Sequence, residues 1–525
     1  MIKKDSNKKG GKKVYFLFLI MPLLLVVIAV FMNNARGPYW LGTNLDPEYV
    51  YLLNSLNLAQ MHGVGHTDHP GTPVQVIGAG VLRIVHTLSG TPNNIETHVL
   101  EQPENYLSAI NTLFIAINVL MLIFLGAGVY YLTRSIAPAL WIQIAPFFSV
   151  VLLRFGLTRV TPEPLLMFAS FLFILALIAT MHMKLKKEFL YLGLITAFGI
   201  ATKVTFLPLI VIPLIVLPTI KKKIYYLLIT FAGFILFTLP IIRMYGKFIQ
   251  WIISLITHTG RYGSGASNIV SSQRYFANMK FLILGNTFFS IILLIALIII
   301  VIALFNPKMR TISLSNIQFR YLVAVVVAQV AGILIVSKHS AHHYLLPVLS
   351  LSGLLGFFIY TYLNHVRVVY NKKKRSLLIP SGLVIVVLFL IVNPITRANE
   401  VINQLDQTRK YSLEVNRVVK SNYHGYIPIY YYPSSSLEYA LKFGNDLSRS
   451  YHTETLEKLY PRVYFYDIWT GRFVRFDYNT EVPFTKIQTE SKGRIIFQGV
   501  SGLKIPGMKF TEVYRNSSKE RIYTY

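Results

Sequence analysis

Cysteine is absent from this 525-residue chain, and charged residues make up only 14% of it. The lack of cysteine excludes a disulfide framework, a thiolate zinc site and a cysteine nucleophile. A soluble globular chain carries nearly twice that charged fraction, whereas 54% of this chain is hydrophobic and its mean hydropathy is +0.51. The composition therefore predicts an integral membrane protein.

Acidic residues are also scarce, since 22 Asp and Glu stand against 51 Lys and Arg, a formal net charge of +29. None lies between Phe189 and Asn399. A reaction in the apolar region that needs a carboxylate must therefore use one of the acids before this stretch. The basic excess could indicate nucleic acid, but short basic loops between apolar segments indicate membrane lipids instead. We expect no nucleic-acid partner.

Long apolar segments predict about eleven membrane-spanning helices. The first follows a lysine-rich tail, residues 1–13, and we interpret it as a retained helix because no A-x-A-like cleavage site comes after it. The predicted spans are 14–32, 107–131, 138–153, 162–181, 189–202, 204–220, 224–242, 281–304, 321–337, 344–363 and 377–395.

Basic residues predict the orientation of these spans. If the N-terminus is cytoplasmic, each inside loop is basic, as the positive-inside rule requires. The outer loops are then residues 33–105 and 243–280, and the tail from residue 397 is also outside. We therefore expect a multi-pass protein of the cell (plasma or inner) membrane.

The tail has the composition of a soluble domain, because 13 of the 22 acidic residues lie at or beyond Glu400. A helix over 399–421 and the strand-like runs YIPIYYYP, PRVYFYDI, GRIIFQGV and KFTEVYR predict a small α/β domain. The expected fold is thus a mostly α transmembrane bundle, residues 14–396, followed by an extracytoplasmic α/β domain, residues 397–525. No repeat of fixed period is visible, which disfavours an inverted-repeat transporter.

Asp46 and Glu48 follow the first span, in the sequence GTNLDPEYVYLL. Asp at the N-cap, then Pro and Glu, form an ordinary helix start. A carboxylate just outside the membrane can also take a proton from an acceptor hydroxyl. The two interpretations are compatible, because a cap fixes the position of its side chain.

His62, His66, Asp68 and His69 lie together in MHGVGHTDHPGTPVQ. Their side chains could ligate a divalent metal, but a run rich in Gly and Pro is also typical of a polar surface loop. We assign no metal and keep the metal site as an alternative. The turn at residues 70–73 is expected to aim Asp68 and His69.

Glu163 lies at the outer start of the fourth span, in RFGLTRVTPEPLLMF. With Pro162 at the first helical position, it has the pattern of a helix start. Arg154 and Arg159 are close in sequence, so we expect an ion pair with Glu163. An acid beside arginines at the membrane edge is also a candidate functional group.

Several cations also belong to the predicted outer side. Lys203 interrupts the apolar hairpin GIATKVTFLPLI, where it could reach the headgroups or a phosphate leaving group. Arg261 lies in TGRYGSG, and His342, His343 and Tyr344 lie in KHSAHHYLL. Together these side chains could neutralise a phosphate or pyrophosphate.

The order of these motifs resembles the C-type glycosyltransferase superfamily, specifically bacterial enzymes like dolichyl-phosphate-mannose protein mannosyltransferases and aminoarabinose transferases. The resemblance covers residues 14–395. It is carried by the early Asp-x-Glu, the His-Pro-Gly-Thr-Pro segment, T-P-E-P-L-L, T-K-x-T and H-H-Y-L-L-P. It implies inverting transfer of a sugar from a polyprenyl-phosphate donor to a lipid, glycan or protein hydroxyl, without a cofactor.

The resemblance also implies roles for individual residues. Asp46 matches the position of the catalytic base, with Glu48 as the near alternative, and Glu163 matches a second acidic position. Lys203 matches a basic residue that faces the donor phosphate. The region of His342, His343 and Tyr344 matches a donor-binding region in relatives. Relatives often carry Lys-Pro-Pro where this chain has His-Pro-Gly-Thr-Pro, so phosphate contacts by that segment do not carry over.

Three other functions fit parts of the sequence. A flippase or transporter of lipid-linked glycans predicts polar residues within several spans, which the acid-free stretch disfavours. An O-antigen-type ligase or polymerase would also use an outer loop but relies on arginines. A third possibility is a non-catalytic scaffold for the tail domain.

Overall fold

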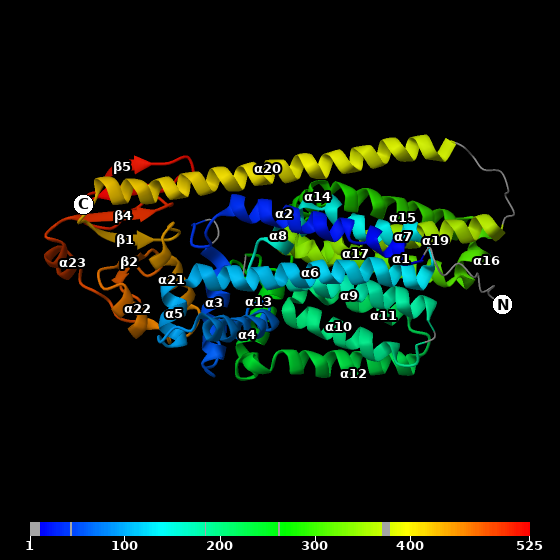
Figure 1. Cartoon of the computed structure of the whole chain (residues 1–525), viewed down its shortest axis with the longest axis horizontal. Helices are drawn as coiled ribbons and strands as arrows, with labels where there is room; N and C mark the ends of the chain where they lie inside the picture. The colour runs from blue at the N-terminus through cyan, green and yellow to red at the C-terminus, as the bar shows by residue number, and fades with distance from the viewer. Residues whose placement is uncertain (1–10, 43–44, 184, 261–262, 370–377) are drawn as a thin grey trace.

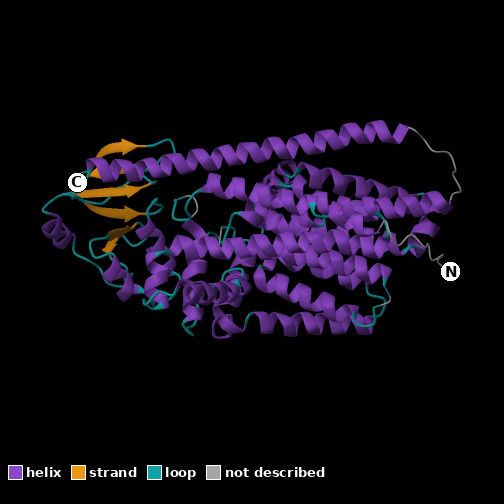
Figure 2. Cartoon of the chain, viewed as in Figure 1, coloured by secondary structure: helices purple, strands orange, loops and turns teal. Residues whose placement is uncertain are grey.

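The computed structural model describes residues 11–42, 45–183, 185–260, 263–369 and 378–525; the side chains of residues 11–13, 45–46, 272, 368 and 378–394 also lie outside the description. Most helices run along the long axis of the molecule, and the strands gather at one end (Figures 1 and 2). We call that end of the helical bundle the domain end. The expectation of a mostly helical chain with a small C-terminal sheet domain is confirmed.

Seven of the described helices or helix runs are long and apolar enough to cross a membrane. An eighth exists if Ile136–Phe148 and Val150–Leu157, bent by 78°, form one broken span. The seven are Val14–Arg36, Pro103–Thr133, Pro162–His182, Leu239–Thr257, Thr287–Phe305, Ile317–His339 and His342–Arg367. They support a membrane protein, while the count of about eleven spans stays a prediction because further apolar helices such as Glu188–Thr202 are shorter.

The helices of the first half of the chain include three short ones in the first predicted outer loop. Their bounds are α1 Gly11–Leu17, α2 Ile20–Arg36, α3 Leu45–Ala59, α4 Thr72–Ser89, α5 Ile95–Glu101, α6 Pro103–Thr133, α7 Ile136–Ile144, η1 Ala145–Phe148, α8 Val150–Leu157, α9 Pro162–His182, α10 Glu188–Thr202, η2 Val204–Ile210, α11 Val211–Val216 and α12 Ile220–Phe237.

The second half continues with helices up to the sheet domain. Their bounds are η3 Leu239–Met244, α13 Tyr245–Thr257, α14 Ser272–Gly285, α15 Thr287–Phe305, α16 Pro307–Ser315, α17 Ile317–Val336, η5 Ser337–His339, η6 His342–Leu345, α18 Leu346–Ser350, α19 Ser352–Val369, α20 Leu378–Asn422, α21 Leu437–Asp446, α22 Thr453–Leu459 and α23 Phe484–Ser491.

Two segments differ from the sequence prediction. Residues 243–280 were expected to be an outer loop, but they contain α13 and most of α14. In α13, Ile249, Ile253 and Ile256 are exposed along one helical face, so the segment is an amphipathic helix rather than a loop. The last predicted span and the amphipathic helix after it are one 45-residue helix, α20. Hydropathy changes from apolar to amphipathic along α20, which is why the sequence suggested two elements.

The C-terminal domain is one six-stranded sheet of order β3-β2-β1-β4-β6-β5. The strands are β1 Ile427–Tyr431, β2 Tyr464–Asp467, β3 Arg472–Val474, β4 Ile495–Gly499, β5 Thr511–Arg515 and β6 Arg521–Thr524. β1 pairs in parallel with β2 and β4, and the other pairings are antiparallel. The sequence predicted β1, β2, β4 and β5. It missed β3 and β6, of 3 and 4 residues, because such short runs carry little periodicity.

The C-terminal domain packs directly on the helices of the first predicted outer loop. Tyr49 and Leu53 of α3 share one buried core with Leu441 of α21 and Phe465 of β2. The approach is close at Gly444, where an added Cβ would lie 2.7 Å from the Tyr49 carbonyl oxygen. The C-terminal domain is therefore joined to the bundle through a shared hydrophobic core, to which α3 contributes.

Candidate functional site

A buried ion pair marks the domain end of the bundle, where α9 begins and α10 ends. Lys203 Nζ lies 2.5 Å from Glu163 Oε1, and both side chains are only 4% exposed. Thr161 Oγ1 donates a 2.6 Å hydrogen bond to the other oxygen, Glu163 Oε2. As the sequence predicted, Pro162 is the first residue of α9, which places Glu163 in the first turn.

The Lys203 backbone is held by the His-Pro-Gly-Thr-Pro segment. The amide of Val204 donates a 3.0 Å hydrogen bond to the carbonyl of His69, and Pro70 pairs with Lys203 as an isolated β-bridge. His69 has a φ of 82°, a left-handed conformation that costs energy for a residue other than glycine. This strained turn joins the segment before α4 to the end of α10.

The ring of His69 points at two aromatic rings of other elements. Its centroid lies 5.1 Å from that of Trp251 in α13 and 5.8 Å from that of Tyr344. Burial, and then the charge of Lys203, hold the pKa of His69 well below its usual range, so the imidazole is neutral at pH 7. Within the described chain, the buried Nδ1 atom of His69 has no hydrogen-bond partner, which is typical of a site that takes a ligand or water.

The two histidines of the predicted donor region lie in different surroundings. Tyr344 places its ring 4.7 Å from Lys203 Nζ, and His343 stacks on Phe155 with centroids 4.8 Å apart. His342 turns toward α14, where Asn286 Nδ2 lies 3.1 Å from His342 Nδ1. The structure thus brings His343 and Tyr344 to the ion pair and places His342 outside this group.

Glu48 forms the second buried ion pair of the domain end. Its side chain is fully buried, and both of its carboxylate oxygens accept hydrogen bonds from Arg159, one of them at 2.8 Å. The sequence suggested that Arg159 or Arg154 pairs with Glu163, and this was wrong, because Lys203 takes that place. Proximity in sequence misled here, since Arg159 and Glu48 are 111 residues apart.

A third group was missed by the sequence reasoning. Arg36, at the end of α2, is 6% exposed and its guanidinium lies 3.4 Å from the centroid of the Tyr39 ring. Nε and Nη1 of Arg36 and the hydroxyl of Tyr39 are buried and, among the described residues, have no hydrogen-bond partner. Glu104 accepts hydrogen bonds from the Tyr39 amide and from the Tyr49 hydroxyl. Arg36 follows the first apolar span in the sequence, and this position was the signal that could have identified the group.

Three further residues were predicted for the site: Asp46, Arg261 and Asp68. Asp46 belongs to the first turn of α3, but its side chain lies outside the described residues, as does Arg261 entirely. Asp68 is half-buried beside His66, and in the described parts its carboxylate makes neither an ion pair nor a hydrogen bond. Asp68 thus directly precedes His69 of the Lys203 turn, and no described side chain bonds to its carboxylate.

The histidine-rich segment does not assemble metal ligands. His62 packs on Tyr451, His66 packs on Tyr51 and His69 faces Trp251, so the rings turn toward different neighbours. Among the residues that the structure describes, no group of three or more His, Cys, Asp or Glu side chains is placed to hold a metal ion. The alternative of a metal site in this segment therefore has no support from the geometry.

The domain end thus combines two buried ion pairs with a neutral imidazole and a buried guanidinium, each of which has nitrogen atoms without a partner among the described residues. Such an arrangement can bind an anionic group and orient a hydroxyl beside it. Comparison of the chain with protein-family models, with curated proteins and with solved structures found no match.

Proposed function

We propose that the chain is a membrane glycosyltransferase that moves a sugar from a polyprenyl-phosphate donor to a hydroxyl of a lipid, glycan or protein acceptor. The observation that carries the proposal is the convergence of Lys203, Glu163, His69 and Tyr344 at one end of an apolar bundle. These residues come from four separate segments. A polar cluster at the end of long apolar helices suits a substrate with an apolar tail and an anionic, sugar-bearing head.

The chemistry follows from the charges of this cluster. The acceptor hydroxyl attacks the anomeric carbon, its proton passes to a carboxylate, and the bond from that carbon to the phosphate oxygen breaks with inversion. The leaving phosphate gains negative charge, which Lys203 is suited to stabilise, together with the Arg36 N–H groups that have no partner in the described part of the chain. The neutral His69 can hydrogen-bond the phosphate or the sugar without adding a charge.

We assign the base to Asp46, in the first turn of α3. Glu48, the alternative, is fully buried with both oxygens bonded to Arg159, so we propose that it holds Arg159 rather than accepting a proton. Asp68 directly precedes His69, whose carbonyl bonds the amide of Val204, and it has no ion-pair partner among the described residues. We propose that Asp68 orients the donor sugar together with His69.

The test compares cells that lack the chain with cells complemented by wild type, Asp46→Ala or Asp68→Ala. Mass spectrometry of surface glycans and lipids should show a sugar-sized mass loss on deletion, restored by wild type and not by Asp46→Ala. Asp68→Ala should restore it only in part. A product unchanged by Asp46→Ala, with normal expression, contradicts Asp46 as base, and a product unchanged by deletion contradicts the glycosyltransferase.

A further inference from the structure

At the end of the bundle opposite the C-terminal domain, three consecutive helices, α15, α16 and α17, form a sharp double turn (Figure 1). Asn306 caps α16 by accepting hydrogen bonds from the amides of Lys308 and Met309. Asn316 caps α17 through the amide of Phe319 at 2.9 Å. Two asparagine caps therefore fix the short helix α16 between two long apolar helices.

An open cleft of about 690 Å³ lies along α16. Four of the seven residues that line the cleft are apolar, namely Leu304, Phe305, Pro307 and Leu314. Phe305 is 83% exposed and Leu314 66% exposed. These side chains continue the apolar exposed surface of α15, which includes Ile298 and Ile302.

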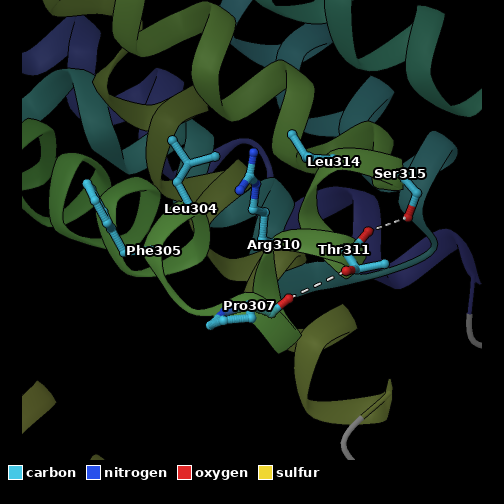
Figure 3. Close-up of a pocket in the computed structure, with 7 residues that line it drawn as sticks. All are labelled: Leu304, Phe305, Pro307, Arg310, Thr311, Leu314 and Ser315. Atoms are coloured by element: carbon cyan, nitrogen blue, oxygen red, sulfur yellow. Dashed lines mark hydrogen bonds between the residues drawn. The ribbon is translucent and has the colours of Figure 1, made fainter.

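The other three residues that line the cleft are polar. Arg310 lies between Leu304 and Leu314, with Thr311 and Ser315 beyond (Figure 3). In the part of the chain that the structure describes, the Arg310 guanidinium makes no ion pair or hydrogen bond. Among the described residues, the hydroxyls of Thr311 and Ser315 bond only to backbone carbonyls of their own helix, at 3.1 to 3.4 Å, and they can turn toward a ligand.

No carboxylate near in sequence can neutralise Arg310. The chain has no Asp or Glu from Phe189 to Asn399. Glu188, at the start of α10, already contacts Lys222 at 2.5 Å. A guanidinium that borders apolar surface without an anion partner favours a ligand that carries its own negative charge.

We propose that this cleft binds the headgroup of an anionic phospholipid from the leaflet at this end of the bundle. The guanidinium of Arg310 contacts the phosphate through two N–H groups, and the hydroxyls of Thr311 and Ser315 donate to the headgroup. The acyl chains lie on Phe305 and Leu314. Free phosphate could also bind the guanidinium, but it would leave the exposed apolar residues of the cleft in water. We therefore propose a lipid rather than free phosphate.

The experiment measures lipid binding by the full-length purified protein with native mass spectrometry. Phosphatidylglycerol is titrated against wild type, Arg310→Gln and Arg320→Gln. Arg320 is the matched control, because it lies exposed in the first turn of α17, does not line the cleft and loses the same charge. We expect Arg310→Gln to weaken binding about five-fold and Arg320→Gln to leave it unchanged. Equal effects of both variants, or no effect of Arg310→Gln, would overturn the proposal.

Two further arms identify the ligand. Leu314→Gln should weaken binding of phosphatidylglycerol but not that of its deacylated headgroup, because the side chain contacts only the acyl region. Inorganic phosphate should not displace the lipid at equal concentration. Displacement by phosphate, or equal binding of phosphatidylcholine, would contradict an anionic-lipid site. The thermal unfolding midpoint of each variant separates lost binding from lost folding.

Discussion

Buried charges at the domain end each contact a specific group. Glu48 contacts Arg159, Glu163 contacts Lys203 and the guanidinium of Arg36 lies over the ring of Tyr39. Removing a charged group from water costs several kcal/mol, and the attraction of its partner offsets only part of this cost. Hydrophobic residues of similar size would pack at lower cost. The pattern therefore favours a functional role for these charges. Each contact holds its charged group in a fixed position.

The Glu163–Lys203 pair gives a test at the scale of single residues. Glu163→Gln leaves the buried ammonium of Lys203 without its counter-ion and should lower the free energy of unfolding by about 3 kcal/mol. The double variant Glu163→Leu with Lys203→Met removes both charges and should recover most of that loss while remaining inactive. Unfolding in mixed detergent micelles measures stability. A double variant with normal activity would show that neither charge serves the reaction.

Glu96 gives a second test, because its pKa depends on contacts with the C-terminal domain. Burial raises the pKa of Glu96, but hydrogen bonds from His452 and Gln60 outweigh burial and lower it to about 2. In the unfolded chain the carboxyl titrates near 4.5. A lowered folded pKa stabilises the fold fully above pH 4.5, and this contribution is lost as the pH falls toward 2.

The measurement is acid unfolding of wild type and Glu96→Gln between pH 6 and pH 2. The variant should be less stable by about 1 kcal/mol at pH 6, after allowance for solvent screening, and the difference should vanish near pH 2. Glu454→Gln is the control, since Glu454 pairs with Lys458 on the exposed surface. A difference that persists at pH 2 would mean that the carboxylate charge is not what stabilises the contact.

At the scale of elements, α3 connects the candidate site with the C-terminal domain. Asn54 Nδ2 donates to the carbonyl of Leu447, and Asn57 Nδ2 donates to the carbonyl of Ser448. The hydroxyl of Ser435 accepts from the amide of Gly42, just before α3. The start of α3, which carries Asp46, is thus held from the side of the C-terminal domain.

Gly444 is where this contact can be disturbed. Gly444→Leu would place a Cβ 2.7 Å from the carbonyl oxygen of Tyr49. This oxygen belongs to the backbone of α3, which cannot move aside as the end of a flexible side chain can. We expect α21 and α3 to separate, with the proposed transferase activity reduced at least ten-fold while the protein stays in the membrane. Gly502→Ala, whose Cβ would be 3.7 Å from the tip of Arg521, is the control. Normal activity of Gly444→Leu would mean that the domain does not position α3.

At the scale of the whole molecule, the two ends of the bundle differ. One end carries the sheet domain and the candidate site, and the other carries α16 with its basic side chains (Figure 1). If the long apolar helices cross a bilayer, these ends face opposite sides. The basic loops of the sequence predict, by the positive-inside rule, that the α16 end faces the cytoplasm.

The absence of cysteine allows a clean test of this orientation. Asn479→Cys lies on the exposed surface of the C-terminal domain, and Lys308→Cys lies on α16 at the other end. A membrane-impermeant thiol reagent should label the first variant in intact cells and the second only after permeabilisation. Wild type should remain unlabelled. Labelling of both variants in intact cells would contradict a bundle that spans the membrane.

The sequence by itself determined the features that depend on near neighbours in the chain. Hydropathy predicted the apolar helices and the membrane, and the Thr-Pro-Glu pattern predicted the start of α9 beside Glu163. Counting acids limited the possible carboxylates to a few. These signals act over one or two helical turns, so they can be read without knowing what packs against them.

Only the tertiary structure decided which distant groups meet. Arg159 pairs with Glu48 rather than with the nearby Glu163, and His343 lies within electrostatic reach of Lys203 whereas His342 contacts Asn286. The docking of the C-terminal domain on α3 likewise joins segments almost 400 residues apart. Such partners are selected by how helices pack around a shared core, which no local pattern records. The sequence therefore predicted most residues of the candidate site, whereas their contacts became known only from the tertiary structure.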